Sequence, residues 1–467
     1  MRKNPPKKMH NSTTTVAAVS TPPGKGGVAL IRICGCEAFA VADRVFCPKN
    51  GRPLSEHMPN MQTYGDIFFD GESIDDGMAT RFSAPHSYTG EDTVEITCHG
   101  GVLVTATVLK AVLAAGALLA APGEFTERAF VNGKLTLTDA EGVGQLLDAA
   151  PVAGLRLSRA SARAGLSEKI GDIRRSLVDL MSSVYARIDY PDEDLGEFSD
   201  GETAERLKHI RAQVCRLIDT YRTGHAVAEG IRTVICGKPN AGKSSLYNAL
   251  LGETAAIVTD IAGTTRDTLT ARAAVGPVLL HLTDTAGLRE TDDPVEKMGV
   301  ARAREKLAAA ELILCVFDLS RPADAEDADL VRYVATLSAK KIAVLNKSDL
   351  PVRFHTDGLA ENFSAVVTVS AEKGDTEALT DCIRVMFTDG EISLGEDAVV
   401  TTARQEATLL RAREFIDTAL AAYGSGMAAD AASSDLELAI GALSETDGRQ
   451  VSEDIVADIF SKFCVGQ

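Results

Sequence analysis

The chain has 467 residues, of which 45% are hydrophobic and 24% are charged, values that are typical of globular proteins and exclude a wholly disordered chain. A chain of this length is expected to form about three domains. The 66 Asp and Glu residues outnumber the 48 Lys and Arg residues and give a net charge of −18, which disfavours general coating of nucleic acid but leaves room for a local basic patch.

The chain shows no sign of a disulfide framework, a membrane span or a secretory signal. Its nine cysteines are scattered without a C-x-x-C pair, which favours thiols in a reducing compartment over disulfides or a zinc site. The longest apolar run, Ala111–Ala121, is shorter than the roughly 20 residues that cross a bilayer. Polar residues follow the basic stretch Met1–Lys8, where a signal would be apolar. We therefore expect a cytoplasmic protein with no membrane association.

The first part of the chain has a mixed α/β pattern. Residues 1–12 are expected to form a disordered extension, and a domain of residues 13–132 follows. In this domain, short apolar runs such as Val28–Ile33 and Val94–Cys98 predict strands between Pro- and Gly-rich turns, and Val102–Leu119 predicts a helix.

Two stretches with helical periodicity flank a segment of short strands. Residues 133–229 and 390–467 carry apolar residues three and four positions apart, as on one face of a helix. Residues 230–389 instead predict a parallel sheet with covering helices. We interpret this order as an α/β domain inserted into a discontinuous helical domain, whose two halves bury each other's apolar faces. The helical stripes are Leu166–Ile188, Leu207–Tyr221, Leu409–Tyr423, Leu436–Leu443 and Ile455–Phe463, and the strands are Ile231–Cys236, Val278–Thr283, Leu312–Phe317, Ile342–Leu345 and Val366–Val369.

A phosphate-binding motif follows the first strand of the inserted domain. Gly237–Ser244 matches G-x-x-x-x-G-K-S/T and precedes the helix-like Ser245–Leu251, which is the context that the motif requires. The glycines let backbone N–H groups close around phosphates at a helix N-terminus. Lys243 should reach the β- and γ-phosphates, and Ser244 should bind Mg²⁺. Alone, the motif could also be a turn rich in Gly and Lys.

Three more motifs follow strands of the same domain. Asp284–Gly287 would place a carboxylate near the metal and an amide near the γ-phosphate. Asn346–Asp349 contains an aspartate that can accept two hydrogen bonds from guanine, one from its ring N–H and one from its exocyclic amine. Adenine cannot donate these two hydrogen bonds. Leaving such acceptors unpaired costs about 1–3 kcal/mol each, so the site should prefer GTP over ATP. Ser370 and Ala371 fit a backbone contact to the guanine carbonyl.

The residue that orients water in Ras-like GTPases is missing. These enzymes carry Gln directly after D-x-x-G, and this chain carries Leu288 there. Catalysis must be supplied by other groups, or the domain is a slow switch.

Further segments appear in a specific order: Thr21–Gly27, Tyr88–Asp92, His99–Gly101, Pro122–Phe130, Thr259–Asp267, Asp284–Arg289 and Phe463–Gly466. Together with Gly237–Ser244 they resemble the tRNA modification GTPase MnmE (TrmE) family over nearly the whole chain. The resemblance implies an N-terminal α/β folate-binding-like domain, a discontinuous helical domain and an inserted Ras-like P-loop GTPase domain.

The resemblance also implies an activity and its partners. Members form a homodimer through the N-terminal domain, which binds 5-formyl-tetrahydrofolate or a related tetrahydrofolate. The GTPase domain depends on K⁺ and is activated when two such domains meet. In a heterotetramer with the FAD-dependent MnmG (GidA), the family installs an aminomethyl-type (carboxymethylaminomethyl) group at carbon 5 of the tRNA wobble uridine.

Residue roles in GTP hydrolysis follow from the same resemblance. Asn240, Thr259, Ile261 and Thr264 match the K⁺ site, where the cation would take the role of an arginine finger. Thr265 matches the threonine on Mg²⁺, and Glu296 matches the glutamate that orients water, so Glu296 and Lys243 are the expected catalytic residues. Asn240 could instead be a plain loop residue, and Glu296 a solvated carboxylate at a helix start. The expected GTP-binding residues are Asn240, Ala241, Gly242, Lys243, Ser244, Ser245, Thr259, Asp260, Ile261, Ala262, Gly263, Thr264, Thr265, Asp284, Thr285, Ala286, Gly287, Asn346, Lys347, Asp349, Ser370 and Ala371.

The folate site is implied by fewer residues. Arg32, Glu95 and Lys134 match family positions around the pterin and glutamate moieties, although each could equally be a surface charge or part of an ion pair. The family usually ends in F-C-x-G-K, whereas this chain ends in Gln467, so any contact of the terminal lysine is weakened, replaced or absent. Cys464, near a flexible end, is either a reactive thiol or a packing residue.

Other classes of function explain less of the sequence. A regulatory GTPase switch in ribosome assembly would bind RNA without modifying it, but it leaves the folate-like motifs without a use, and the chain after Thr402 is not basic. A pure scaffold conflicts with an intact nucleotide site. His99–Gly101 resembles an esterase oxyanion loop, but G-x-S-x-G is absent from the sequence.

Overall fold

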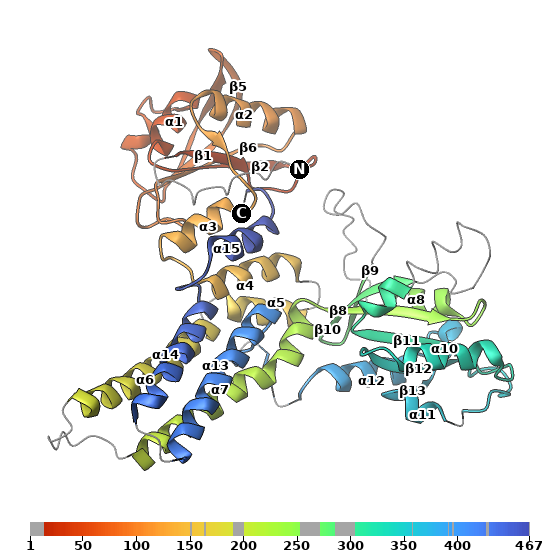
Figure 1. The fold of residues 1–467 in the computed structure, drawn as a ribbon. Helices are drawn as coiled ribbons and strands as arrows, with labels where there is room; N and C mark the ends of the chain where they lie inside the picture. The colour runs from red at the N-terminus through yellow and green to blue at the C-terminus, as the bar shows by residue number, and fades with distance from the viewer. Residues whose placement is uncertain are drawn as a thin grey trace, which may run out of the picture. The chain divides into compact units, whose positions relative to one another are not determined.

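The chain divides into two compact units, Met1–Gly144 with Ser444–Gln467 and Gln145–Leu443. The extension expected at residues 1–12 lies outside the residues that the structure describes. Figure 1 shows the ribbon of a computed structural model, which describes residues 14–149, 152–162, 165–189, 200–252, 271–284, 304–356, 358–390, 392–394, 397–425 and 429–466.

A seven-stranded sheet with the order β3-β4-β5-β6-β2-β1-β7 forms the core of the first unit. All paired strands are antiparallel except β1 and β7. Side chains alternate between the faces of a strand, so Ala17 of β1 packs with helices α1 and α2, while Val16 and Ala18 pack with Phe125. The elements are β1 (Val16–Val19), β2 (Val28–Cys34), α1 (Ala38–Val45), β3 (Phe46–Pro48), β4 (Gln62–Phe69), β5 (Glu72–Phe82), β6 (Thr93–His99), α2 (Val102–Ala114), β7 (Leu118–Leu119), α3 (Glu124–Val131) and α4 (Leu137–Asp148).

The helix predicted over Val102–Leu119 is wrong in its last five residues. Helix α2 ends at Ala114, and Gly116 then takes a φ of +117°, a conformation that glycine adopts more readily than other residues. Leu118–Leu119 form the edge strand β7, which pairs with β1. An apolar run is compatible with either a helix or a strand, and here a glycine turn separates the helix from an edge strand whose two leucines are exposed.

The C-terminal residues complete this unit. Helix α15 (Glu453–Ser461) packs Ile459 and Phe460 against Leu137 of α4. Beyond it, Val465 forms an antiparallel bridge with Pro122. Compactness therefore groups the residues after Leu443 with the N-terminal unit, while the domain boundaries at residues 132, 229 and 389 stay predictions.

The helical part of the second unit is built from both flanks of the insertion, as predicted. Leu177 of α6, Val214 of α7, Leu409 of α13 and Leu436 of α14 are buried in one hydrophobic cluster. This shared cluster confirms the discontinuous helical domain. Each flank buries its apolar stripe against the other. Its helices are α5 (Val152–Ser161), α6 (Gly165–Asp189), α7 (Asp200–Ala228), α13 (Ala403–Gly424) and α14 (Ala429–Thr446).

The inserted domain contains a six-stranded sheet with the order β13-β12-β11-β8-β10-β9. The five predicted strands are parallel, and β9 adds an antiparallel edge beside β10. Ile235 packs with α8 and α12, while its neighbours Val234 and Cys236 pack with α10 on the opposite face. The elements are β8 (Ile231–Gly237), α8 (Lys243–Gly252), β9 (Ala271–Val275), β10 (Val278–Asp284), β11 (Leu312–Asp318), α10 (Ala325–Ala335), β12 (Lys340–Asn346), α11 (Leu359–Asn362), β13 (Ala365–Thr368) and α12 (Glu377–Phe387).

This sheet sets the position of the candidate site. The phosphate motif follows β8, Asn346 ends β12, and Ser370 lies two residues beyond β13. Since carboxyl ends of parallel strands meet at one edge of a sheet, the three segments come together there. None of the helices in the described parts of the chain has the length and apolar character needed to span a bilayer.

Candidate functional site

The phosphate loop between β8 and α8 has a backbone that its glycines make possible. Gly237 has a φ of +148°, and a Cβ atom there would lie 2.4 Å from the carbonyl oxygen of Val316. Gly242 has a φ of +96°, and its Cβ atom would lie 2.0 Å from Nδ2 of Asn346. Asn240 takes a φ of +62°, a left-handed conformation that asparagine tolerates better than most residues. The loop therefore reaches a compact geometry that larger side chains would prevent.

Positive charge is concentrated where this loop meets the helix. The Lys243 ammonium donates hydrogen bonds to the carbonyl oxygens of Gly237, at 3.0 Å, and Lys238, at 2.8 Å. The exposed Ser244 and Ser245 lie in the first turn of α8, whose N–H groups and dipole favour anions. The arrangement suits a polyphosphate.

Asn346 joins three of the predicted segments. Its buried side chain donates from Nδ2 to the carbonyl oxygen of Ala241, at 2.9 Å, and its Oδ1 accepts from the N–H of Ala371, at 3.0 Å. Ser370 donates from Oγ to Oδ1 of Asp349 at 2.7 Å, and this hydrogen bond lowers the pKa of the Asp349 carboxyl. Phosphate loop, base-recognition motif and Ser370–Ala371 thus form one connected site, with an exposed carboxylate that can accept hydrogen bonds from a base.

Asp318 supports this site and was not singled out from the sequence. It ends β11, and its Oδ2 accepts a hydrogen bond of 2.6 Å from the Lys347 ammonium, while Oδ1 accepts from Ser320. Burial would raise the pKa of Asp318, but the hydrogen bonds from Lys347 and Ser320 outweigh it and lower the pKa. Asp318 lies at the carboxyl end of a parallel strand, at the same edge of the sheet as the other site residues. This position was the signal that could have identified it from the sequence.

Lys238 anchors the phosphate loop from the other side. Its ammonium contacts Asp324 and lies 3.0 Å from Oδ2 of Asp327, two carboxylates at the start of α10. Asp324 also caps that helix by accepting from the N–H of Asp327. The loop is therefore attached to α10 through Lys238 and to β12 through Asn346.

Part of the predicted nucleotide site lies outside the described residues. This holds for Thr285, Ala286, Gly287 and Glu296, and nothing is described of the Asp284 side chain. Of the metal ligands, Ser244 and Asn240 are described, whereas Thr265 and the remaining K⁺ ligands are not. The undescribed segment before β9 contains Thr259, Asp260, Ile261, Ala262, Gly263, Thr264 and Thr265.

In the N-terminal unit, two of the three folate candidates form an ion pair. Arg32 of β2 and Glu95 of β6 lie directly opposite each other in register, with 2.8 Å between Nη2 and Oε1. The Arg32 guanidinium also lies 5.8 Å from the ring centre of Tyr88 and 5.4 Å from that of Phe125. Lys134 donates to the carbonyl oxygen of Pro85 at 3.0 Å. Arg32 and Lys134 therefore both contact the loop that carries Pro85 and Tyr88.

Arg128 forms a buried network that the sequence did not reveal. Its guanidinium lies 2.8 Å from Glu124 Oε1 and 2.8 Å from Glu91 Oε2, and it donates to the carbonyl oxygen of Thr14 at 2.9 Å. Burial would lower the pKa of Arg128, but the hydrogen bonds with Glu124 and Glu91 outweigh it, and the pKa is raised. The network joins the segments Tyr88–Asp92 and Pro122–Phe130, which explains their polar residues structurally.

The C-terminal tail is docked, contrary to the expectation of a flexible end. The carbonyl oxygen of Cys464 accepts from the N–H of Gly123 at 3.2 Å, and that of Gly466 accepts from Oγ of Ser20 at 2.9 Å. The side chain of Cys464 is exposed, so a reactive thiol stays a prediction. Gln467 lies outside the described residues.

His99 belongs to a small polar cluster and not to an oxyanion loop. Its Nδ1 lies 2.7 Å from Oδ1 of Asp75, and Asp76 lies beside them. The hydrogen bond with Asp75 raises the pKa of His99. The following Gly100 packs so closely that a Cβ atom would lie 2.7 Å from the carbonyl oxygen of Gly26, which explains the glycine directly after His99.

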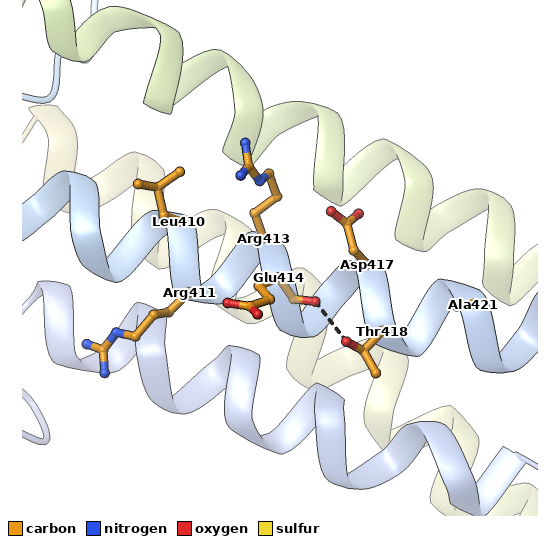
Figure 2. A pocket seen from close by; sticks show the side chains of 7 residues that line it. All are labelled: Leu410, Arg411, Arg413, Glu414, Asp417, Thr418 and Ala421. Carbon is orange, nitrogen blue, oxygen red and sulfur yellow. Dashed lines mark hydrogen bonds between the residues drawn. The ribbon is translucent and has the colours of Figure 1, made fainter. Parts of the chain in front are cut away.

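An open groove of about 610 Å³ runs along α13 (Figure 2). Arg413 and Asp417 point to one side and Arg411 to the other, while the Thr418 hydroxyl donates to the carbonyl oxygen of Glu414 at 3.1 Å. Asp417 is already paired with Arg211 of α7. Charges of both signs line the groove, and none of its lining residues belongs to the predicted nucleotide site.

Known proteins resemble the chain over almost its whole length. The family model described as the MnmE helical domain matches residues 137–464, and the one described as the N-terminus of the GTP-binding protein TrmE matches residues 15–134. A tRNA modification GTPase MnmE of Symbiobacterium thermophilum is 41% identical, with 97% of this chain and 99% of the relative covered. Proteins of the same name from Moorella thermoacetica and Thermotoga maritima are 40% and 37% identical, with 97% of this chain and 99% and 100% of the relatives covered.

Proposed function

The chain belongs to the MnmE (TrmE) family of tRNA modification GTPases, and on this premise we propose that it is a K⁺-dependent GTP hydrolase that modifies the wobble uridine of tRNA. With an FAD-containing partner of the MnmG (GidA) type, it adds an aminomethyl-type (carboxymethylaminomethyl) group at carbon 5 from a folate one-carbon unit. The chain works as a homodimer in the cytoplasm and forms a heterotetramer with that partner.

The observation that carries the GTP assignment is the connection of three loops through Asn346. Because this buried amide binds the carbonyl of Ala241 and the N–H of Ala371, guanine recognition and the phosphate loop share one rigid support. Asp349, whose carboxyl has a lowered pKa, presents an ionised acceptor to the guanine ring N–H and exocyclic amine. Lys243 binds the β- and γ-phosphates once it leaves the carbonyl oxygens of its own loop.

The metal ligands in the described residues fit their proposed roles. Ser244 presents its hydroxyl in the first turn of α8 and holds Mg²⁺ together with Thr265. Asn240 is exposed within the phosphate loop, and among the described residues no hydrogen-bond partner is found for its side chain, so its amide oxygen can ligate K⁺. When bound, K⁺ supplies positive charge beside phosphates that become more negative during hydrolysis. Thr259, Ile261 and Thr264 complete its shell, and Glu296 orients the attacking water in place of the absent Gln.

Steady-state GTP turnover in K⁺ and in Na⁺ tests the hydrolysis mechanism. Turnover should be fast in K⁺ and slow in Na⁺ at equal ionic strength, and equal rates would overturn the K⁺ assignment. Glu296→Ala should suppress hydrolysis while binding of a fluorescent GTP analogue persists. The exposed Glu361→Ala is the matched control and should turn over normally. Unchanged turnover of Glu296→Ala would remove this residue from the mechanism.

The folate proposal uses the Arg32–Glu95 pair. A carboxylate can pair with the N–H edge of a pterin, and a cation such as Arg32 or Lys134 can pair with the glutamate moiety of the ligand. Since Arg32 and Glu95 are bonded to each other, binding must rearrange or share this pair. Isothermal titration with 5-formyl-tetrahydrofolate tests the site, with Glu95→Gln as the weakened variant. Absence of binding to the unsubstituted chain would reject the folate assignment.

The tRNA reaction separates this proposal from a ribosome-assembly switch. Deletion of the gene should remove the modified wobble nucleoside from bulk tRNA, and complementation with the intact chain should restore it. A normal nucleoside profile in the deletion strain would favour the switch, because a pure regulator leaves tRNA chemistry unaltered.

A further inference from the structure

Helix α5 turns one distinct face to solvent. Its buried residues Gly154, Leu157, Ser158 and Ser161 face the protein, and Leu157 packs with Val227, Ala228 and Val399. The opposite face has the spacing i, i+3, i+4, i+7 of neighbours on a helix. It consists of Val152 and Leu155, which are 67% and 48% exposed, and of the exposed Arg156 and Arg159.

The charges on this face are not neutralised locally. Between Asp148 and Glu168 the sequence contains no Asp or Glu, although the whole chain has a net charge of −18. Other exposed arginines form ion pairs with a carboxylate three positions away, as Arg175 does with Asp172 and Arg384 with Asp381. Within the described parts of the chain, neither Arg156 nor Arg159 has an ion-pair partner.

We propose that the exposed face of α5 (Val152, Leu155, Arg156 and Arg159) binds the ribose-phosphate backbone of tRNA. Positions i and i+3 of a helix lie about 5–6 Å apart, so both guanidinium groups can contact one stretch of backbone. A guanidinium binds phosphate in a planar, bidentate manner. The inference rests on the proposed function, which makes tRNA the substrate. Because α5 contributes two cations and no carboxylate, its exposed face gives this acidic protein a local site for a polyanion.

Salt dependence of tRNA binding tests this inference. Fluorescence anisotropy with an unmodified tRNA transcript measures the association constant at several KCl concentrations, for the intact chain and for R156Q/R159Q. The slope of log K against log [salt] is negative, and each lost phosphate contact reduces its magnitude by about 0.7–0.9. The magnitude for the double variant should therefore be smaller by about 1.4–1.8. At 0.15 M salt the same relation predicts binding that is about 10–30-fold weaker.

Two further double variants make the result specific. R175Q/R384Q removes the same charge from exposed arginines that are ion-paired, and it should keep the slope of the intact chain. R156K/R159K keeps both positive charges and should therefore keep most of the salt dependence. If the arginines acted only through helix packing, their replacement by lysine would not be expected to preserve tRNA binding in this way. GTP turnover should be unchanged in all three variants, since none of these residues lies in the nucleotide site.

The failures are distinguishable. If the intact chain binds tRNA and R156Q/R159Q has the same slope, the inference is overturned and the proposed function stands. If that variant keeps its tRNA binding but loses the FAD-containing partner in a pull-down, α5 is a protein-docking face and the inference is equally overturned. If the intact chain shows no tRNA binding at any salt concentration, the inference and direct action on tRNA fail together.

Discussion

Replacement of Arg128 by Met should destabilise the N-terminal unit more than any surface substitution. The side chains of Arg128 and Glu124 are 3% and 2% exposed, so the loss of the guanidinium leaves a carboxylate buried without its counter-charge. Removing one partner of a buried ion pair costs about 3–5 kcal/mol. Glu91 is 16% exposed and can reach water, so the penalty falls mainly on Glu124. In a unit of this size, each kcal/mol lowers Tm by about 2–4 °C, which gives a decrease of about 6–20 °C.

Differential scanning calorimetry of the full chain measures this change, and hydrogen–deuterium exchange assigns the transition to the N-terminal unit. The double variant Glu124→Gln with Arg128→Met removes the stranded charge and should recover part of the loss, since a neutral pair avoids the desolvation penalty. Arg52→Met, at an exposed position, is the control and should leave Tm within about 2 °C. A Tm of Arg128→Met within that range, or a double variant as unstable as the single one, would refute the reasoning.

Three other substitutions test the nucleotide site and the contact between α7 and the inserted domain. Gly242→Ala places a Cβ atom 2.0 Å from Asn346 Nδ2 at a φ of +96°. Strain of about 1–3 kcal/mol should weaken binding of a fluorescent GDP about 5–150-fold. Gly252→Ala, with no atom within 4 Å, should bind normally. Asp349→Asn keeps one acceptor oxygen and replaces the other by an NH2 donor. The loss of one acceptor contact of about 1–3 kcal/mol should weaken GTP binding about 5–150-fold, whereas xanthosine triphosphate, which accepts a hydrogen bond from the new amide, should bind better. Burial alone would lower the pKa of His225, but hydrogen bonds to two carboxylates raise it from 6.5 to about 9. The stability that His225 contributes should therefore be complete below pH 6.5 and vanish as the pH rises through about 9, so the Tm difference from His225→Gln should shrink over that range.

The hydrophobic pattern was sufficient to predict helices with one buried apolar face and strands made of one continuous apolar run. The stripe that contains Ile170 and Ile173 became α6, and the run Leu312–Phe317 became β11. It failed where local preference was weak. The sequence Ala271–Val275 is rich in alanine, which has little preference for strands, and it forms β9 only because the edge of β10 offers it hydrogen bonds.

Motifs predicted which residues of the nucleotide site come together but not how they are supported. The strand ends brought Lys243, Asn346 and Asp349 to one edge, as expected from parallel topology. The contacts of Asp318 with Lys347 and of Lys238 with α10 depend on side chains far apart in sequence, for which no local pattern exists. The same holds for Arg128, whose two carboxylate partners lie on different segments of the N-terminal unit.

The end of α7 is where motion of the inserted domain would reach the helical domain. His225 Nε2 lies 2.9 Å from Oε1 of Glu311, directly before β11, and the N–H of Asp389 donates to Oγ1 of Thr223 at 2.8 Å. One turn of helix therefore contacts the inserted domain near the beginning of a central strand and at the end of the insertion. Gly224 lies in the same turn, and a Cβ atom there would lie 2.0 Å from the carbonyl oxygen of Val400. Because the contacts of His225 and Thr223 with the inserted domain share this turn, and Gly224 packs it against Val400, any rotation of the inserted domain would also strain or displace the end of α7.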